Sequence, residues 1–192
     1  MAPEPTSRDI ERVALVLHHR PHDVLGPHAA AGGVVVRAFR PDALGIRLLP
    51  DDPTRPSLEM RRIHDLGVFE VTVSRAAMPL RYRLEVRYET GTFTLRDPYA
   101  FPPSLGDLDL HLASEGTHEQ IYKRLGAHVR TLDETHGTAF SVWAPAADRV
   151  SVVGDFNAWD GRLHAMRRIG HGVFEIFVPD IGEGALYKFE VR

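Results

Sequence analysis

The sequence contains an internal repeat with a period of about 105 residues, and this repeat limits the possible folds more than any other feature. Three segments of the first half recur in the second half in the same order and at matching spacing: GVVVRAFRPDALGIRLL (33–49) with GTAFSVWAPAADRVSVV (137–153), MRRIHDLGVFEVTV (60–73) with MRRIGHGVFEIFV (166–178), and LRYRLEV (80–86) with ALYKFEV (185–191). Each segment is β-rich and bounded by Pro, Gly or Asp, which is typical of short strands joined by turns. The repeat therefore predicts two copies of one β-module.

The predicted fold class is all-β: two tandem immunoglobulin-like β-sandwiches with a short amino-terminal helix and a short linker helix. Within residues 6–19 the apolar residues recur at helical spacing, Thr6 or Ser7 is the expected N-cap, and Pro21 ends the pattern. Prolines and glycines between the copies predict an extended connection that ends in a short helix near 118–125. We therefore predict four parts in order: a helical segment at 1–28, a first module at 29–110, a linker at 111–130 and a second module at 131–192.

The two copies differ at their carboxyl ends. In the first copy the last shared strand continues through a Glu89-Thr90-Gly91 turn into a hairpin partner, TFTLRDPY (92–99), whereas the second copy stops at Arg192. A sheet that lacks this strand would expose an edge, which natural domains avoid. The comparison predicts that the chain is a fragment of a longer protein, truncated within its second module.

Composition excludes several classes of partner. The 192 residues include 23 Lys and Arg and 26 Asp and Glu, so the net charge is -3, which favours neither a nucleic-acid partner nor a membrane-surface partner. There is no cysteine, which excludes disulfides and thiolate metal sites. The first residues are unlike a secretion signal, and no stretch reaches the roughly 18 apolar residues of a membrane span. We predict a soluble, cytoplasmic protein.

The second copy carries a motif that the first lacks, GDFNAWDG at 154–161. Together with the segment that follows it, this motif resembles carbohydrate-binding module family 48, a β-sandwich of branching and debranching enzymes and of glycogen-associated kinase subunits. Three longer stretches resemble bacterial glycogen branching enzymes: HHRPHDVLGPH (18–28), RDPYAFPPSLGDLDLHLASEGTHEQIYKRLGAH (96–128) and FSVWAPAADRVSVVGDFNAWDGR (140–162). The family has HPMR where this chain has His164-Ala165-Met166-Arg167, a departure expected to affect only a turn.

The resemblance implies an activity that this stretch does not contain. Such enzymes carry two sandwich modules before a (β/α)8 barrel, and they cut an α-1,4-glucan and rejoin the piece through an α-1,6 bond. The barrel supplies the two carboxylates of the retaining mechanism, so no catalytic residue maps onto these 192 residues. We therefore expect a glucan-binding part with no transferase activity of its own. The implied partners are α-glucans, such as glycogen and maltooligosaccharides, and the missing barrel of the same chain.

Three residues are predicted to bind carbohydrate: Trp159, Lys188 and Asn157. A pyranose has apolar C–H faces and a polar rim, so a flat aromatic ring covers the face while amides and cations bond the hydroxyls. By the resemblance, Trp159 is the stacking platform and Lys188 the basic residue of such modules. The alternatives are that Trp159 plugs the end of the sandwich, that Lys188 guards a strand edge, and that Asn157 only forms a turn.

Other candidate groups are predicted to be structural. Trp143 and Phe156 are expected in the core, and the first copy has no aromatic residue in its equivalent loop, LPDDPTRPS at 49–57. His18 and His22 are four residues apart, but Pro21 breaks a shared helix, so no metal site is predicted. The aspartates lie in segments that are typical of turns. No phosphate-binding glycine loop is present, and no cofactor is expected.

Three other functions remain open from the sequence: a stand-alone glycogen-targeting adaptor, a structural immunoglobulin-like brace or dimerisation module, and part of a debranching enzyme. The sequence of the gene beyond Arg192 would separate the adaptor from an enzyme. Titration with maltoheptaose would separate a binding module from a brace. The connection GTHEQIYKRLGAH (116–128) disfavours a debranching enzyme.

Overall fold

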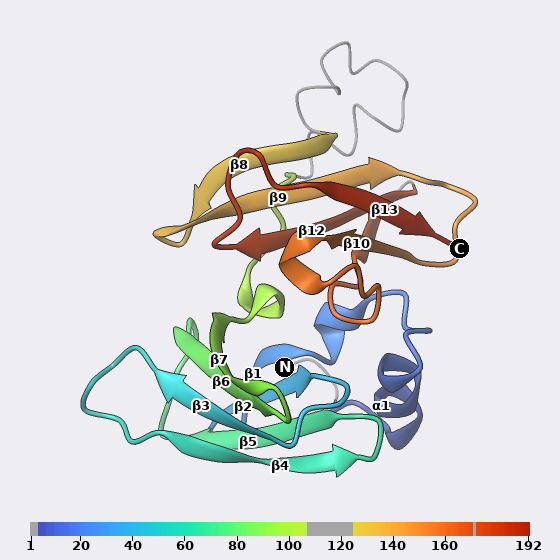
Figure 1. The fold of residues 1–192 in the computed structure, drawn as a ribbon. Helices are drawn as coiled ribbons and strands as arrows, with labels where there is room; N and C mark the ends of the chain where they lie inside the picture. The colour runs from blue at the N-terminus through green and yellow to red at the C-terminus, as the bar shows by residue number, and fades with distance from the viewer. Residues whose placement is uncertain (1–3, 107–124, 171) are drawn as a thin grey trace. The chain divides into compact units, whose positions relative to one another are not determined.

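The computed structural model describes residues 4–106, 125–170 and 172–192. The described chain is built mainly of antiparallel strands, which confirms the predicted all-β sandwich class (Figure 1). It divides into two compact units, Met1–Ala100 and Phe101–Arg192. The linker helix predicted near 118–125 falls largely on 107–124, which lie outside the described residues.

The first unit opens with a short helix, α1 (Ser7–Ala14), that is capped as the sequence predicts. The Thr6 hydroxyl accepts from the Asp9 backbone amide at 3.2 Å, and the Asp9 carboxylate accepts from the Thr6 amide at 2.9 Å, so each side chain satisfies one free N–H of the first turn. The helix is shorter than the predicted 6–19, because Val16 takes a left-handed conformation at φ 56°. A single 3-10 turn, η1 (Pro21–Asp23), follows.

Seven antiparallel strands form the first sandwich: β1 (Gly26–Ala30), β2 (Gly33–Phe39), β3 (Gly45–Pro50), β4 (Leu58–His64), β5 (Val68–Ser74), β6 (Tyr82–Tyr88) and β7 (Gly91–Arg96). They run in the order β1-β2-β5-β4-β3-β6-β7. The amino-terminal half of β4 pairs with β3 and its carboxyl-terminal half pairs with β5. Because β4 belongs to both layers, the sheet curls back on itself and encloses a core.

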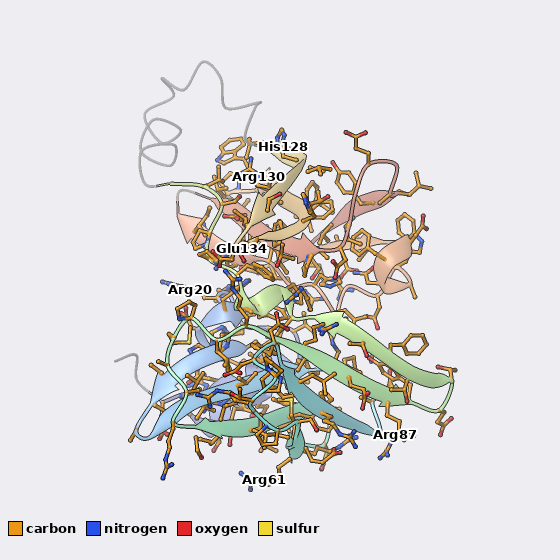
Figure 2. The ribbon with its side chains drawn as sticks, turned by 90° about the vertical axis from the view of Figure 1, so that its left-hand side faces the viewer. Arg20, Arg61, Arg87, His128, Arg130 and Glu134 are labelled. Carbon is orange, nitrogen blue, oxygen red and sulfur yellow. The ribbon has the colours of Figure 1, made fainter. Side chains whose placement is uncertain are left out.

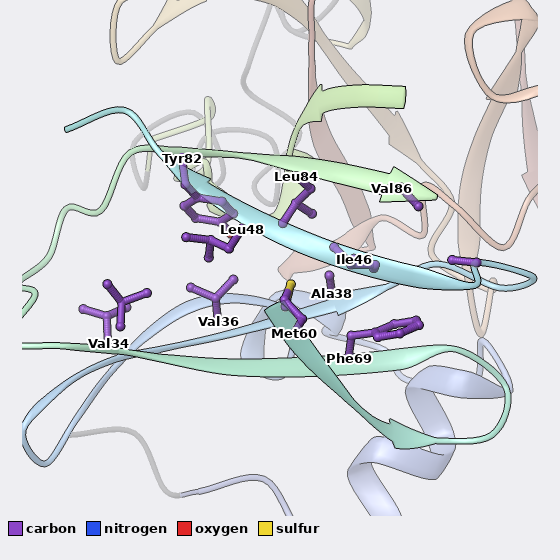
Figure 3. Close-up of a cluster of buried hydrophobic side chains, with 12 residues drawn as sticks. Val34, Val36, Ala38, Ile46, Leu48, Met60, Phe69, Tyr82, Leu84 and Val86 are labelled. Carbon is purple, nitrogen blue, oxygen red and sulfur yellow. The ribbon is translucent and has the colours of Figure 1, made fainter. Parts of the chain in front are cut away.

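That core contains twelve buried side chains from both layers (Figure 3). Alternate residues of β2, β3 and β6 point inward, as the period of two along a half-buried strand requires. The members are Val34, Val36, Ala38, Ala43, Ile46, Leu48, Met60, Phe69, Val73, Tyr82, Leu84 and Val86.

A polar pair lies beside this core. The Tyr82 hydroxyl donates to Asp97 Oδ2 at 2.7 Å, and the Tyr99 backbone amide donates to Asp97 Oδ1 at 3.0 Å. Tyr82 and Asp97 are both buried, and Asp97 precedes the 3-10 turn η2 (Pro98–Ala100). Burial raises the pKa of Asp97, outweighing the lowering by its hydrogen bonds and by Arg40. The pair joins β6 to η2.

This raised pKa predicts how stability depends on pH. A carboxyl whose pKa is higher in the folded than in the unfolded state stabilises the fold most when protonated, so this contribution is lost as pH rises through the folded pKa. We expect Asp97→Asn, which cannot ionise, to gain stability relative to the wild type as pH rises above about 4, the ordinary aspartate value. Hydrogen exchange of the β6 amides over a pH series measures the difference. Equal pH slopes in the two proteins would contradict it.

The second unit is a smaller sandwich of two sheets. Its strands are β8 (Gly126–Leu132), β9 (Thr135–Trp143), β10 (Val150–Gly154), β11 (Arg167–Gly170), β12 (Val173–Pro179) and β13 (Tyr187–Val191). One sheet has the order β11-β12-β9-β8 and the other pairs β10 with β13. The 3-10 turn η4 (Asp155–Asn157) follows β10.

The predicted repeat is present in the strand pairing. β2 pairs with β5 as β9 pairs with β12, and β3 pairs with β6 as β10 pairs with β13. Even the irregularities correspond, because the ladder shifts between Arg62 and His64 in β4 and between Arg168 and Gly170 in β11. Such matched bulges in two places of one chain support duplication of the whole unit.

The repeat also extends further toward the amino end of each unit than the predicted modules, which start at 29 and 131. LGPH (25–28) opens β1 and LGAH (125–128) opens β8. His28 Nε2 lies 3.1 Å from the Leu25 carbonyl oxygen, and His128 Nε2 lies 2.9 Å from the Leu125 carbonyl oxygen (Figure 2 labels His128). Both histidines therefore close the same local turn at the start of an outer strand.

Residues 101–106 belong to the second unit, although the first module was predicted to extend to 110. The Phe101 ring packs 4.8 Å from that of Phe177 on β12. The Ser104 backbone amide donates to Glu175 Oε1 at 2.6 Å, and Arg167 Nη2 donates to the Phe101 carbonyl oxygen at 3.1 Å. This segment thus covers the outer face of the four-stranded sheet, and Glu175 and Phe177 are fully buried there.

Candidate functional site

The loop at 154–161 is held in a compact, locally strained conformation. Ala158 and Trp159 both have left-handed backbone angles, with φ 51° and φ 61°. The Trp159 backbone amide donates to the Gly154 carbonyl oxygen at 3.0 Å. Gly154 has to be glycine, because a Cβ there would collide with the carbonyl oxygen of Leu186. Non-glycine residues in left-handed conformations gather at functional sites, where surrounding contacts hold them.

Trp159 projects its indole into solvent from this loop. Its exposed fraction is 43%, and its Nε1 donates to Asp155 Oδ1 at 3.1 Å. The hydrogen bond fixes the ring orientation while a large part of the ring surface stays accessible. The alternative in which Trp159 plugs the sandwich end does not fit this exposure.

Lys188 lies beside this indole. It is exposed on β13 opposite Val153 of β10, and its Nζ lies 5.9 Å from the centre of the Trp159 ring. This distance is within the range of a cation–π contact. The indole and the ammonium therefore form one surface, here called the Trp159 face, although the two residues are far apart in the sequence.

Asn157 lies inside the loop and not on the Trp159 face. It is only 5% exposed. Its Oδ1 accepts from the Gly154 backbone amide at 2.9 Å, and its Nδ2 donates to the Val152 carbonyl oxygen at 2.9 Å. Because the amide is buried and engaged with the backbone, its position fits a brace for the loop and not a direct contact with a ligand.

Charged groups lie on the loop and the strand that carry Trp159 and Lys188. Asp160 binds the guanidinium of Arg162 at 2.8 Å; burial raises the pKa of Asp160, but the hydrogen bonds from Arg162 lower it more, so the net shift is downward. Glu190, on the same side of β13 as Lys188, pairs with Arg149 and Arg192 at 3.6 and 3.0 Å. The loop and the strand that carry the Trp159 face thus also carry groups that can bond hydroxyls.

Phe156 and Trp143, which were both predicted to lie in the core, differ in burial. Phe156 is half-buried, with its ring 5.8 Å from Phe140 and 5.6 Å from His164. The core prediction for Trp143 is wrong, because Trp143 ends β9 and is 60% exposed. Alternation along β9 places Trp143 on the outer face of the four-stranded sheet. Residues 101–106 cover this face near Phe177, but they do not shield Trp143 from solvent.

The first unit has a different group of residues at the equivalent position. Arg83 of β6 pairs with Leu49 as Lys188 pairs with Val153. Asp51 lies 3.7 Å from Arg83 and 3.0 Å from Arg96, so Arg83, the counterpart of Lys188, is held in an ion-pair network. Since residues 49–57 contain no aromatic ring, this position does not reproduce the Trp159 face.

The histidines and carboxylates do not form a metal-binding cluster in the part of the chain that the structure describes. Over the same residues, no helix has the length and apolarity to cross a membrane.

Two family models match the chain. Residues 6–99 match the alpha-1,4-glucan branching enzyme GlgB, N-terminal domain. Residues 124–192 match carbohydrate-binding module 48 (isoamylase N-terminal domain). Each match lies within one of the two units of the structure.

Curated relatives are similar over almost the whole chain. The 1,4-alpha-glucan branching enzyme GlgB of Myxococcus xanthus is 50% identical over 186 residues, which is 96% of this chain and 25% of that protein. The enzyme of the same name from Paramagnetospirillum magneticum is 49% identical over 187 residues, 96% of this chain and 24% of that protein. The chain thus spans about a quarter of the length of these relatives. A pullulanase from Bacillus acidopullulyticus is similar at 26% identity over 39% of this chain and 10% of that one, with a TM-score of 0.35.

Proposed function

Because this chain belongs to the GlgB family of 1,4-alpha-glucan branching enzymes, of which it spans an amino-terminal quarter, we propose that it is the glucan-binding, non-catalytic part of such an enzyme. The observation that supports this proposal is the Trp159 face: a half-exposed indole, oriented by Asp155, with the ammonium of Lys188 5.9 Å from its ring. We assign α-glucans, such as glycogen and maltooligosaccharides, as its ligand.

The chemistry of the Trp159 face matches that of a glucose ring. An indole face covers the apolar C–H face of a pyranose, and the hydroxyls at the ring edge need donors and acceptors. Lys188 offers N–H donors, while Asp155 offers a carboxylate acceptor beside the ring. Because the indole is already oriented in the absence of sugar, little side-chain freedom is lost on binding.

Binding at one such face should be weak. One stacked tryptophan contributes only on the order of 1 to 2 kcal/mol beyond the rest of the contact. A branched glucan presents many chain ends, so tight association would arise from several weak contacts made at once. The proposed role is therefore to keep substrate near a catalytic domain.

Trp159→Ala is expected to abolish maltoheptaose binding to this unit, because it removes the stacking surface. The chain contains two tryptophans, so in Trp143→Phe the indole of Trp159 is the sole tryptophan reporter. We expect Trp143→Phe to retain the fluorescence response to maltoheptaose and Trp159→Ala to lose it. Calorimetric titration of both variants separates lost binding from a lost reporter.

The matched variant Lys188→Met keeps the aliphatic stem and removes the ammonium, and we expect it to weaken binding by several-fold. Absence of maltoheptaose binding in both the wild type and Trp159→Ala would leave the immunoglobulin-like unit as a structural brace. Unchanged affinity in Trp159→Ala would mean that the sugar binds away from the Trp159 face, and either result would overturn the proposal.

We propose further that residues 1–192 make no α-1,6 branches by themselves and that they act with a catalytic barrel of the same protein in the cytoplasm. The retaining mechanism needs two carboxyl groups about 5 Å apart across the scissile bond. The relatives, about four times longer, leave room for such a domain. Incubation with amylose, followed by iodine staining, tests this; a falling absorbance at long wavelength would contradict it.

A further inference from the structure

A buried pair of polar side chains lies under the Trp159 loop. His164 is 7% exposed and Asn157 is 5% exposed, and His164 Nδ1 lies 2.8 Å from Asn157 Nδ2. The Val152 backbone amide donates to the His164 carbonyl oxygen at 3.1 Å. His164 is therefore fixed by its own backbone where the loop returns to the sandwich, and its ring reaches the brace of the loop.

The backbone partners of Asn157 determine the orientation of its side-chain amide. One end of the amide faces the Gly154 N–H, which can only donate, and the other faces the Val152 carbonyl, which can only accept. The oxygen must face Gly154 and the nitrogen must face Val152. The NH2 group then donates one hydrogen to the Val152 carbonyl oxygen and the other to His164 Nδ1.

This arrangement sets the protonation state of the imidazole. A nitrogen that accepts a hydrogen bond must carry a lone pair, so His164 Nδ1 is unprotonated and the ring proton of the neutral form sits on Nε2. Protonation at Nδ1 would set two donors against each other 2.8 Å apart in a buried site. Since a buried N–H without an acceptor is costly, the imidazolium and the braced loop exclude each other.

We propose that His164 is a positioning residue that holds the Trp159 loop through the lone pair on Nδ1, so that glucan binding weakens when this histidine is protonated. The inference rests on the proposed binding of glucan at the Trp159 face, whose regulation it describes. His164 does not touch the sugar. It acts through Asn157, which ties Val152 and Gly154 at the base of the loop.

The groups around the imidazole determine how the loop responds. The ring of Phe156 packs 5.6 Å away and offers no charge. Asp160 is close enough for His164 to lower the pKa of its carboxyl, but Asp160 already accepts from Nε and Nη2 of Arg162, at 3.0 and 2.8 Å. That carboxylate would attract an imidazolium, whereas the side-chain nitrogen of Asn157, itself a donor, would repel one. Protonation is therefore expected to rotate the ring and release the brace.

The first test does not involve sugar. Nitrogen NMR of the histidine rings reports the tautomer, and we expect His164 to carry its proton on Nε2 near neutral pH. On titration from about pH 8 to about pH 5, the range in which histidines change charge, the protection factor of the Gly154 amide, which corrects its exchange rate for the intrinsic pH dependence of amide exchange, should fall by at least tenfold. A proton on Nδ1 near neutral pH, or a Gly154 amide that stays protected while His164 titrates, would overturn the proposal.

The second test uses variants in the intact 192-residue chain. His164→Gln can present its side-chain oxygen to Asn157 and cannot titrate, so maltoheptaose affinity should be retained and become independent of pH over this range. His164→Leu offers no acceptor, and its affinity should be low at every pH. The control is His136→Gln, which removes an exposed histidine of β9 and should keep the wild-type pH profile.

These outcomes separate the inference from the function on which it rests. If no variant binds maltoheptaose at any pH while Gly154 protection follows His164 titration, the proposed function fails and the positioning role stands. If wild type and His164→Gln lose affinity equally on acidification, His164 is not the group responsible, whereas glucan binding is established.

Discussion

Phe177→Ala is expected to lower the free energy of unfolding of the second unit by about 3–5 kcal/mol, the usual cost of deleting a buried aromatic ring. Phe177 has no exposed surface. Its ring lies against Phe101 at 4.8 Å and over Gly137, where a Cβ would lie 2.5 Å from the ring. The neighbours are strands and a glycine backbone, which cannot collapse into the space left by the ring.

Urea unfolding followed by tryptophan fluorescence measures this loss, because both tryptophans, Trp143 and Trp159, lie in the second unit. The matched control is Leu186→Ala in the same unit, where the side chain is 64% exposed, and it should change stability by no more than about 0.5 kcal/mol. A loss below about 1 kcal/mol in Phe177→Ala would show that residues 101–106 do not bury this face in solution.

Asp97→Ala is expected to destabilise the first unit by about 2–4 kcal/mol. The substitution leaves two buried donors, the Tyr82 hydroxyl and the Tyr99 amide, without their acceptor, and each orphaned group costs about 1–3 kcal/mol. Removing a carboxyl that is costly to ionise offsets part of this loss. The net effect is still large because both donors are packed inside the unit.

The first unit contains no tryptophan, so hydrogen exchange of the β6 amides is the measurement. Tyr82→Phe, which removes the hydroxyl alone, should cost about 1.5–3 kcal/mol, the range for a hydrogen bond to a charged group. Asp65→Ala replaces an exposed turn aspartate of the same unit and serves as the control. Equal effects of Asp97→Ala and Asp65→Ala would contradict a structural role for the buried pair.

Much of the fold was predictable from local patterns. Residues 33–49 and 137–153 were both predictable as a strand, a proline turn and a second strand, because each is rich in β-formers and interrupted by a proline segment. The outer strands β1 and β8 were harder to predict, because GPHAA and GAHVR contain few β-formers. A signal was nevertheless present: the LGxH tetrapeptide occurs at 25–28 and again at 125–128.

The candidate site was only partly predictable. The sequence identified the Trp159 loop and Lys188, but it did not show that the indole and the ammonium lie within 5.9 Å. The role of Asn157 as a buried brace was also hidden, because it depends on partners at Val152 and His164. Trp143 resembled a core residue because it ends a strand whose central residues, 137–141, are buried, yet it is 60% exposed.

The sequence by itself determined the family, the β-rich modules and their duplication, because these depend on which residue follows which along the chain. Only the tertiary structure decided that Phe101 and Ser104 complete the second unit, that Glu175 and Phe177 are buried beneath them, and that Asn157 supports Trp159 from within. The physical reason is that burial and hydrogen bonding each depend on a second segment of the chain that the fold brings close. A strand pattern shows that a side chain faces a layer, but the segment that covers it can come from dozens of residues away.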